Sequence, residues 1–325
     1  MSKQQPELTG TRCLSIWARL SALALLPMLA GYAGGWHWLL DLCAHFRWQY
    51  AVVLALGGLP ALLLRRRRLA AAFLAGSILN GWSLVTATGP AIEPGADGSM
   101  AVASTWKLLV VNVHVGLVDT RPLWQLIEQE SPDVIGIIEL SPTVGVALAP
   151  LDDRYPIHLK QPRDDPFGMG LWTRWPDATI EVRHTPPLGY PSLILHREEA
   201  MSASVWLLHP FPPISAEAAG WRDQHLAQVA DQIGRDPWAI VAGDFNASPW
   251  SQAYVSFRRR TGLNDSSAAQ LPWPTWFATG AAGALLAVPI DHILQGARWR
   301  VVERRIGPDI GSDHRPLIVS LAPEK

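Results

Sequence analysis

The chain has 325 residues, of which 49% are hydrophobic and 17% charged, and its formal net charge is −1. The charge is unevenly divided. Residues 1–100 contain eight Lys and Arg against four Asp and Glu, whereas residues 101–325 contain nineteen against twenty-four. The resulting net charge of −5 on the larger part argues against a protein that follows nucleic acid through its phosphate charge. The length suits one large domain or two modest ones.

Three apolar stretches without Asp, Glu, Lys or Arg occupy much of the first hundred residues, at about 20–38, 48–64 and 69–88. Each is close to the length that crosses the hydrocarbon core of a bilayer. Four consecutive arginines, Arg65 to Arg68, separate the second stretch from the third and are expected to face the cytoplasm. We therefore expect residues 1–88 to form a bundle of about three transmembrane helices.

The same charge rule orients this bundle. Arg12 and Arg19 place the N-terminus in the cytoplasm, so three spans put the rest of the chain at the periplasmic face of a bacterial inner membrane. Both cysteines, Cys13 and Cys43, lie in the apolar region, and a thiol-free outer part folds without oxidation. The alternatives are a cleaved signal peptide and a buried helical hairpin of a soluble protein.

A Gly- and Pro-bearing linker at 89–104 leads to a predicted catalytic domain at 105–325. Strands outnumber helices in that domain, and helices separate only some of them. We therefore expect an α+β fold with two facing sheets and helices outside, and no internal repeat is visible. The predicted strands lie at 107–113, 133–140, 157–159, 168–172, 178–182, 192–196, 204–208, 238–242, 288–294 and 317–321, and the predicted helices at 121–130 and 217–233.

Short polar motifs adjoin several of these strands. Carboxylates there can hold a hard cation through oxygen, amides can donate to phosphate oxygens, and imidazoles can move or stabilise charge. The sequence therefore predicts a hydrolytic phosphate site. The motifs are Asn112-Val113-His114, Glu139, Gly243-Asp244-Phe245-Asn246, Asp291-His292 and Ser312-Asp313-His314.

In this order and spacing the motifs resemble the endonuclease/exonuclease/phosphatase superfamily, which has the DNase I-like fold. The resemblance extends over about residues 105–321 and is carried most specifically by Gly243–Asn246 and Ser312–Pro316. It implies a four-layer α/β/β/α sandwich and a metal-dependent hydrolase of phosphoric esters. It also implies Mg²⁺ as cofactor, with Mn²⁺ as a possible substitute, held by Glu139 with Asp313 beside it.

The resemblance also implies roles for the other motif residues. Asp244 would position and deprotonate the attacking water. Asn112 and Asn246 would hold phosphate oxygens and Asp244 itself. His314 would stabilise charge on the phosphoryl group, with its tautomer fixed by Asp291.

Other positions are less determined by the motifs. His209, at a strand end, matches a second family histidine that can protonate the leaving oxygen. Trp276 resembles part of a family loop near the site, where it would either pack or contact the substrate. His114 could face the site or point away from it, while His292 is expected on the opposite side of its strand. Arg222 is interpreted as a solvated charge.

These observations favour a membrane-anchored phosphodiesterase or phosphatase that acts on a lipid head group or lipid-linked phosphate. Its expected partners are membrane lipid and a phosphate-ester substrate, and no protein partner can be inferred. Trp250 and the pair Trp273 and Trp276 could form an apolar rim around the site. The alternatives are a Mg²⁺-dependent nuclease acting on extracytoplasmic nucleic acid and a non-catalytic membrane binding module.

Overall fold

The computed structural model describes residues 5–89, 105–198, 202–268 and 270–324. Its contacts divide the chain into two compact units. The first contains Met1–Ala87 with Trp250–Gln252, and the second contains Thr88–Pro249 with Ala253–Lys325. Apart from Gly89, the predicted linker at 89–104 lies outside the described residues.

The first unit is helical. Two of its helical segments, Thr11–Ala33 and Arg67–Thr86, are long and apolar enough to cross a membrane, and a third candidate is a helix pair bent by 64°. Exposed leucines cover these helices, as expected for a surface that meets lipid. The elements are α1 (Gln5–Leu23), α2 (Leu25–Ala30), η1 (Gly31–Ala33), α3 (Trp38–Ala44), α4 (Arg47–Leu63) and α5 (Arg67–Thr86).

The first apolar segment differs from the expectation of a span at 20–38. Its helical part starts earlier and ends at Ala33, and a turn then leads to His37, whose imidazole Nδ1 accepts a hydrogen bond from the Leu39 amide at the start of α3. Near this end of the segment the backbone packs closely against α3, because a Cβ on Gly31 would lie 2.9 Å from the Cα of Ala44. The absence of Asp, Glu, Lys and Arg from residues 20–38 does not reveal this turn, because the residues that form it are uncharged as well.

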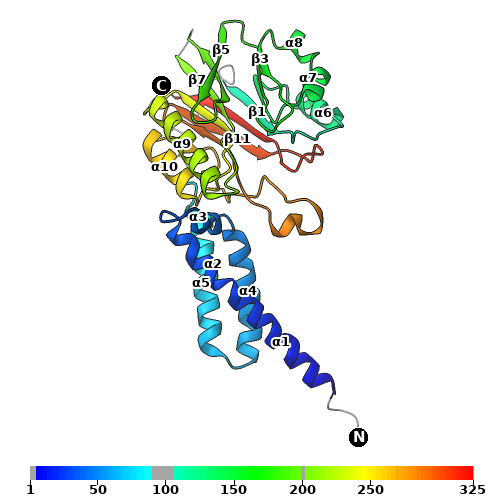
Figure 1. Ribbon diagram of the computed structural model, residues 1–325, viewed down its shortest axis with the longest axis vertical. Helices are drawn as coiled ribbons and strands as arrows, with labels where there is room; N and C mark the ends of the chain where they lie inside the picture. The colour runs from blue at the N-terminus through cyan, green and yellow to red at the C-terminus, as the bar shows by residue number, and fades with distance from the viewer. Residues whose placement is uncertain (1–4, 90–104, 199–201, 269, 325) are drawn as a thin grey trace. The chain divides into compact units, whose positions relative to one another are not determined.

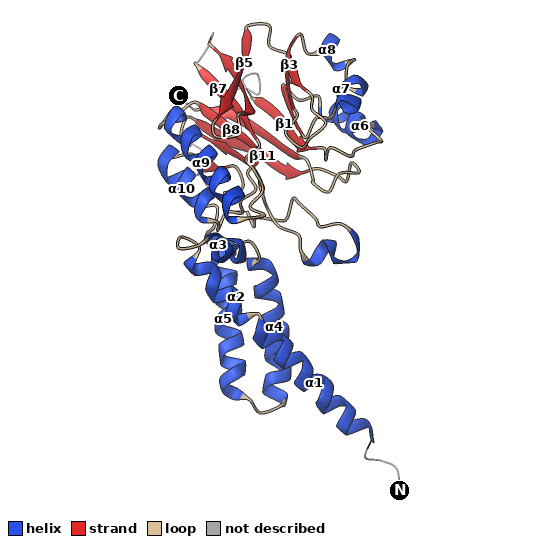
Figure 2. Cartoon of the chain, viewed as in Figure 1, coloured by secondary structure: helices blue, strands red, loops and turns tan. Residues whose placement is uncertain are grey.

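The second unit is a sandwich of two mixed six-stranded sheets (Figures 1 and 2). Sheet 1 has the order β11-β12-β1-β2-β4-β3, and sheet 2 has the order β5-β6-β7-β8-β10-β9. Sheet 1 is built from β1 (Trp106–Asn112), β2 (Val134–Ile138), β3 (Ile157–Gln161), β4 (Met169–Thr173), β11 (Trp299–Ile306) and β12 (Leu317–Pro323). Sheet 2 is built from β5 (Ala178–Thr185), β6 (Tyr190–Arg197), β7 (Ala203–Leu208), β8 (Ala239–Asp244), β9 (Asn264–Asp265) and β10 (Asp291–Gln295).

Three apolar layers hold the sandwich together. Side chains alternate across each strand, so Leu108 of β1 enters the core between the sheets while Leu109 packs outward under the helices. On the far side, Val241 of β8 packs with Leu226 of the helix that covers sheet 2. The covering helices are α6 (Arg121–Glu130), α7 (Pro142–Ala147) and α8 (Leu151–Arg154) on sheet 1, and α9 (Ala216–Ile233) and α10 (Gln252–Thr261) on sheet 2. The predicted α+β fold of two facing sheets is therefore confirmed.

The connectivity of the two sheets repeats, although the sequence shows no repeat. In each sheet a central parallel pair is joined through a helix, as β1-α6-β2 and as β7-α9-β8. The chain then passes through helix and edge strand before returning beside the second strand, as β3-β4 and as β9-β10. An antiparallel hairpin, β11-β12 or β5-β6, completes each sheet. The repeat therefore exists in topology without recognisable sequence similarity.

Candidate active site

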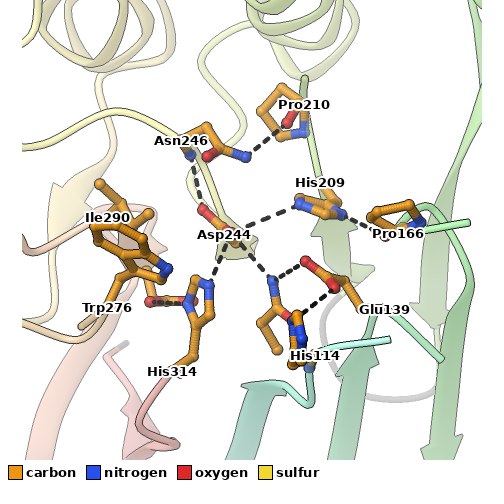
Figure 3. A network of polar contacts seen from close by, with 12 residues as sticks. His114, Glu139, Pro166, His209, Pro210, Asp244, Asn246, Trp276, Ile290 and His314 are labelled. Carbon is orange, nitrogen blue, oxygen red and sulfur yellow. Dashed lines mark hydrogen bonds and ion pairs between the residues drawn. The ribbon is translucent and has the colours of Figure 1, made fainter. Parts of the chain in front are cut away.

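The predicted site residues lie where the parallel pairs end. Asn112 is the last residue of β1 and Glu139 follows β2, while Asp244 ends β8 and His209 follows β7. Because β1 and β2 are parallel, and β7 and β8 likewise, both pairs deliver their polar residues to one edge of the sandwich. Asp291 begins the antiparallel strand β10 and pairs in register with Asp244, which brings it to the same edge. Figure 3 shows the resulting network.

Unusual backbone conformations accompany these strand ends. Glu139 has φ +59°, His114 has φ +59° and Asn246 has φ +48°, a left-handed region that non-glycine residues rarely enter. Such conformations persist only where surrounding contacts impose them, and they are frequent at functional sites. Gly243, just before Asp244, has φ +147°, and a Cβ built there would lie 2.0 Å from the carbonyl oxygen of Leu208.

Gly243→Ala is therefore expected to lower the free energy of unfolding by more than about 3 kcal/mol, because the added methyl group would clash with Leu208 and force β7 and β8 apart. Gly220→Ala is the matched control. Gly220 lies inside α9 with open space around its Cβ position, so alanine there should stabilise by up to ~1 kcal/mol. Thermal or denaturant unfolding of both variants checks this expectation, and equal midpoints would contradict it.

Asn112 connects the two sheets. Its side-chain Nδ2 donates to Glu139 Oε1 at 2.9 Å, on sheet 1, and to Asp244 Oδ2 at 3.2 Å, on sheet 2. Its Oδ1 accepts a hydrogen bond from the His114 amide at 2.9 Å, which fixes the orientation of the Asn112 side chain. The Asn112 amide therefore holds the two carboxylates in a defined relation to each other.

Asp244 is the centre of the network and is 2% exposed. Its Oδ1 accepts a hydrogen bond from the Asn246 amide at 2.8 Å. Its Oδ2 lies 3.6 Å from Nε2 of both His209 and His314. Burial raises the pKa of the Asp244 carboxyl and the negative charge of Asp291 adds to this, whereas His314 and His209 oppose it. A carboxylate with a raised pKa is a stronger base than an exposed one.

The imidazole of His314 carries a positive charge, opposite to that of the Asp244 carboxylate. Its Nδ1 donates to Asp291 Oδ2 at 2.9 Å, and its backbone amide donates to Ser312 Oγ at 3.0 Å. Burial alone would lower the pKa of His314, but the carboxylates of Asp291 and Asp244 outweigh it and raise the pKa to about 10. At neutral pH the imidazole ring is therefore a cation with two N–H donors.

His209 has a fixed ring orientation. Its Nδ1 lies 3.0 Å from the backbone carbonyl oxygen of Pro166, which can only accept, so Nδ1 carries a proton and Nε2 is directed at Asp244. The face of the ring packs against Phe167, with 5.3 Å between ring centroids. Both contacts place Nε2 on the side of Asp244 opposite His314, as Figure 3 shows.

Two residues have different surroundings from those predicted. Arg222 on α9 is 1% exposed and donates from Nη1 to the backbone oxygen of Asn246, so its interpretation as a solvated charge is wrong. The Asn246 side chain donates to the Pro210 carbonyl at 3.0 Å, which ties the loop after β8 to the loop after β7. Arg222 and Asn246 thus support the loop that carries Asp244.

Glu139 and Asp313 have the features of cation ligands. Glu139 Oε2 accepts a hydrogen bond from the Val115 amide at 2.9 Å, and Asp313 Oδ2 accepts one from Trp276 Nε1 at 3.0 Å. Within the described residues, the other oxygen of Asp313, Oδ1, is buried without a hydrogen bond. Such a buried carboxylate oxygen fits a divalent cation, which prefers oxygen ligands.

A second group that could hold a cation consists of Asp244, Asp291 and His314, whose ligand atoms lie within 4.8 Å of one another. Within this group, His314 Nδ1 and Asp291 Oδ2 are hydrogen-bonded to each other at 2.9 Å. His114, left open by the sequence, does face the site. Its Nδ1 lies 3.7 Å from both Glu139 Oε2 and Asp313 Oδ1. His292 instead bonds the backbone oxygen of Ala247 and takes no part.

A comparison with protein-family models matches residues 109–314 to the endonuclease/exonuclease/phosphatase family. The chain belongs to this family. It is therefore a metal-dependent hydrolase of phosphoric esters, which sets aside the interpretation as a non-catalytic binding module. The matched residues begin in β1 and end at His314, so they include all the strand ends described above.

Solved structures with the same fold support this assignment at the level of architecture. D. rerio TDP2 in complex with a single-strand DNA product is 18% identical, with a TM-score of 0.55 over 67% of this chain and 99% of its own. The AP endonuclease LMAP from Leishmania major is 15% identical, with a TM-score of 0.54 over 74% and 94%. The human Nocturnin catalytic domain with a bound sulfate is 16% identical, with a TM-score of 0.51 over 67% and 94%. A search of curated proteins found no match.

Proposed function

We propose that this family member is a Mg²⁺-dependent phosphodiesterase or phosphatase, tethered to a bacterial inner membrane with its site facing the periplasm. Its proposed substrate is a lipid head group or a lipid-linked phosphate. The observation that carries the proposal is the presence in one chain of candidate membrane spans and a phosphoester-hydrolase site. An enzyme held at a bilayer meets lipid phosphates at high local concentration.

In the proposed mechanism Asp244 accepts the proton of the attacking water, as its raised pKa and burial favour. The His314 imidazolium donates to a phosphoryl oxygen and stabilises the charge that develops there. His209 Nε2, which lies 3.6 Å from Asp244 Oδ2, relays to the leaving oxygen the proton that Asp244 has taken from the water. Asn112, through its side-chain amide, and Asn246, through its backbone amide, position Asp244, and Asp291 keeps His314 oriented through Nδ1. The Asn246 side chain, which gives one Nδ2 hydrogen to Pro210, is proposed to donate the other to a phosphate oxygen.

Glu139 and Asp313 are the proposed Mg²⁺ ligands, with Mn²⁺ as a substitute. A divalent cation held there would neutralise phosphate charge and lower the barrier to attack by a nucleophile. Trp276 is proposed to contact substrate and, through its indole N–H, to orient Asp313. His114 lies against the same two carboxylates and is a further residue of this part of the site.

The surroundings of two basic clusters, Arg258-Arg259-Arg260 and Arg304-Arg305, support a lipid rather than a nucleic acid as the substrate. Arg260 pairs with Asp231, and Arg305 pairs with Glu130 and Glu303, so the charge of both clusters is partly neutralised within the protein. Burial lowers the pKa of Arg304, although Asp265 and Tyr254 oppose this, and the guanidinium is not displayed to solvent as a phosphate contact would require.

A nuclease remains the second candidate, because one of the similar structures is named an endonuclease and another contains a single-strand DNA product. The test compares the full chain, in detergent with Mg²⁺, on phospholipid vesicles, a lipid-linked phosphate, DNA and RNA. We expect lipid turnover to exceed nucleic-acid turnover by at least about tenfold, and chelator to abolish it. Tight DNA binding that weakens steeply with salt, together with DNA cleavage, would overturn the lipid assignment and favour the nuclease.

Topology has a separate test. A reporter that is active only outside the cytoplasm should be active when fused after residue 100 and silent when fused at Arg68, because the four-arginine block is retained inside. A cytoplasm-active reporter fused at the same two positions is the control and should give the reverse pattern. An active outside reporter at Arg68 would place the catalytic unit in the cytoplasm.

A further inference from the structure

The segment between β9 and β10 is unusual in composition. Its twenty-five residues, 266–290, contain no Asp, Glu, Lys, Arg or His, although 17% of the whole chain is charged. It is rich instead in Ala, Leu, Trp, Pro and Gly, and it includes the short helix η3 (Gly280–Leu285). A surface segment of a water-facing domain normally carries several charges at this length.

Large apolar side chains of this segment are turned to solvent. Leu285 is 71% exposed, Leu286 is 44% exposed and Trp273 is 54% exposed. Single exposed apolar residues are ordinary on protein surfaces, but three in one uncharged segment, two of them consecutive, are an unusual concentration. The part that carries η3, drawn in orange in Figure 1, extends away from the sheets instead of packing under them.

The base of this segment is fastened to the active site. The amides of Thr275 and Trp276 donate to the Val288 carbonyl at 3.1 and 3.0 Å, and Val288 donates back to Trp276, so the two sides of the loop are paired. Trp276 then reaches Asp313 through its indole N–H, and the Phe277 amide donates to the Asp313 carbonyl at 2.9 Å. The exposed residues therefore project from one wall of the site.

The absence of charge and the exposed Leu and Trp side chains of the segment indicate which kind of surface it contacts. A nucleic-acid backbone requires cations, and residues 266–290 contain none. Exposed Leu with Trp, free of charge, suits the boundary between lipid head groups and acyl chains, where an indole is favoured and Leu side chains leave water. The candidate spans of the same chain bring it to a bilayer.

We propose that the exposed side chains of this segment, Leu285, Leu286 and Trp273, insert into the bilayer surface and so hold the Trp276–Asp313 wall of the site at the lipid head groups. The inference rests on the proposed lipid substrate and adds the surface by which the enzyme reaches it. A soluble ester would reach the site without this insertion, whereas a lipid would depend on it.

The first test measures insertion directly. The full chain, with Cys13 and Cys43 replaced by Ala, is reconstituted in phospholipid vesicles with an environment-sensitive fluorophore at Leu285→Cys. We expect a blue shift and quenching by lipids that carry a quencher near the head group. Val146→Cys is the matched control, because Val146 is an equally exposed apolar residue, at 77%, on α7. Quenching by aqueous iodide at both positions alike would overturn the proposal.

Cross-linking tests whether the exposed apolar residues instead contact a second copy of this chain. If these residues formed an interface between two copies of this chain, the Leu285→Cys variant would form disulfide-linked dimers in detergent, and this would also overturn the proposal. Monomers with lipid quenching support it.

A kinetic test separates this inference from the proposed function. In the double variant Leu285→Gln and Leu286→Gln, we expect KM for a bilayer phospholipid to rise about tenfold or more. Turnover of a soluble aryl phosphodiester should stay within about twofold. Lipid hydrolysis without quenching at Leu285→Cys would overturn the insertion alone, and quenching without lipid hydrolysis would overturn the lipid substrate alone.

Discussion

Asp244→Asn is expected to reduce the rate of phosphoester hydrolysis by on the order of a thousandfold. The amide has nearly the same shape and can still accept the hydrogen bond from the Asn246 backbone, but it cannot take a proton from water. The loss should appear in kcat with little change in KM, because the carboxylate acts on the nucleophile and not on ground-state binding. Steady-state kinetics of the full chain with Mg²⁺ measure both constants.

The control is Asp231→Asn, which removes an exposed carboxylate that pairs with Arg260 on the protein surface. It should leave kcat unchanged within about twofold, since an exposed ion pair contributes little. A thermal midpoint for both variants shows whether the fold is retained. If Asp244→Asn were folded and retained most of its activity, another residue would have to be the base, and His209 would be the nearest alternative.

Asp291→Asn is expected to move the alkaline limb of the pH–rate profile from near pH 10 toward neutrality. In the native protein burial opposes protonation of His314, but Asp291 and Asp244 raise its pKa to about 10, so the imidazolium persists throughout the physiological range. The asparagine amide still accepts the hydrogen bond from His314 Nδ1, but it lacks the negative charge of Asp291, which raises the pKa of His314 more than any other charge does. Each pH unit above the new pKa then costs about tenfold in the active form.

The same substitution has a defined effect on stability. The pKa of His314 is higher in the folded protein than its ordinary value of 6.5, so its contribution to stability is complete below about pH 6.5 and is lost as pH rises toward 10. The stability difference between native protein and Asp291→Asn should therefore shrink over that interval. A profile whose alkaline limb does not move would show that the charge of His314 is not required for the reaction.

Much of the sandwich could be predicted because its central strands are buried on both faces. β2 is an unbroken run of Val, Ile and Gly, and β8 likewise consists of apolar residues up to Gly243, so each is visible as a short apolar run. β11 was not predicted, because it is an edge strand in which Arg300, Glu303, Arg304 and Arg305 interrupt the apolar pattern. α10 was not predicted either, since three of its ten residues are consecutive arginines.

The site could be predicted only as far as motifs identify residues. Asp244, Glu139 and His314 stand in motifs, and the structure brings them together at one edge of the sandwich. Arg222 carries no local signal, because its burial depends on the meeting of α9 with the loop after β8. The direction of the His114 side chain follows from its φ of +59°, a backbone choice that side-chain alternation along a strand does not predict.

The repeated topology has a consequence for how the enzyme is made. Sheet 1 pairs β1 with β12, and Ser312 Oγ bonds the backbone oxygen of Asn112 across 200 residues of chain. During synthesis β1 therefore waits, with one edge unpaired, while the whole of sheet 2 is produced and can fold. The hairpin of β11 and β12 completes sheet 1 when β12 pairs with β1. Asp313 and His314 lie between these last two strands. A nascent chain that has not yet paired β12 with β1 therefore lacks a complete site and cannot hydrolyse the cell's own phosphate esters.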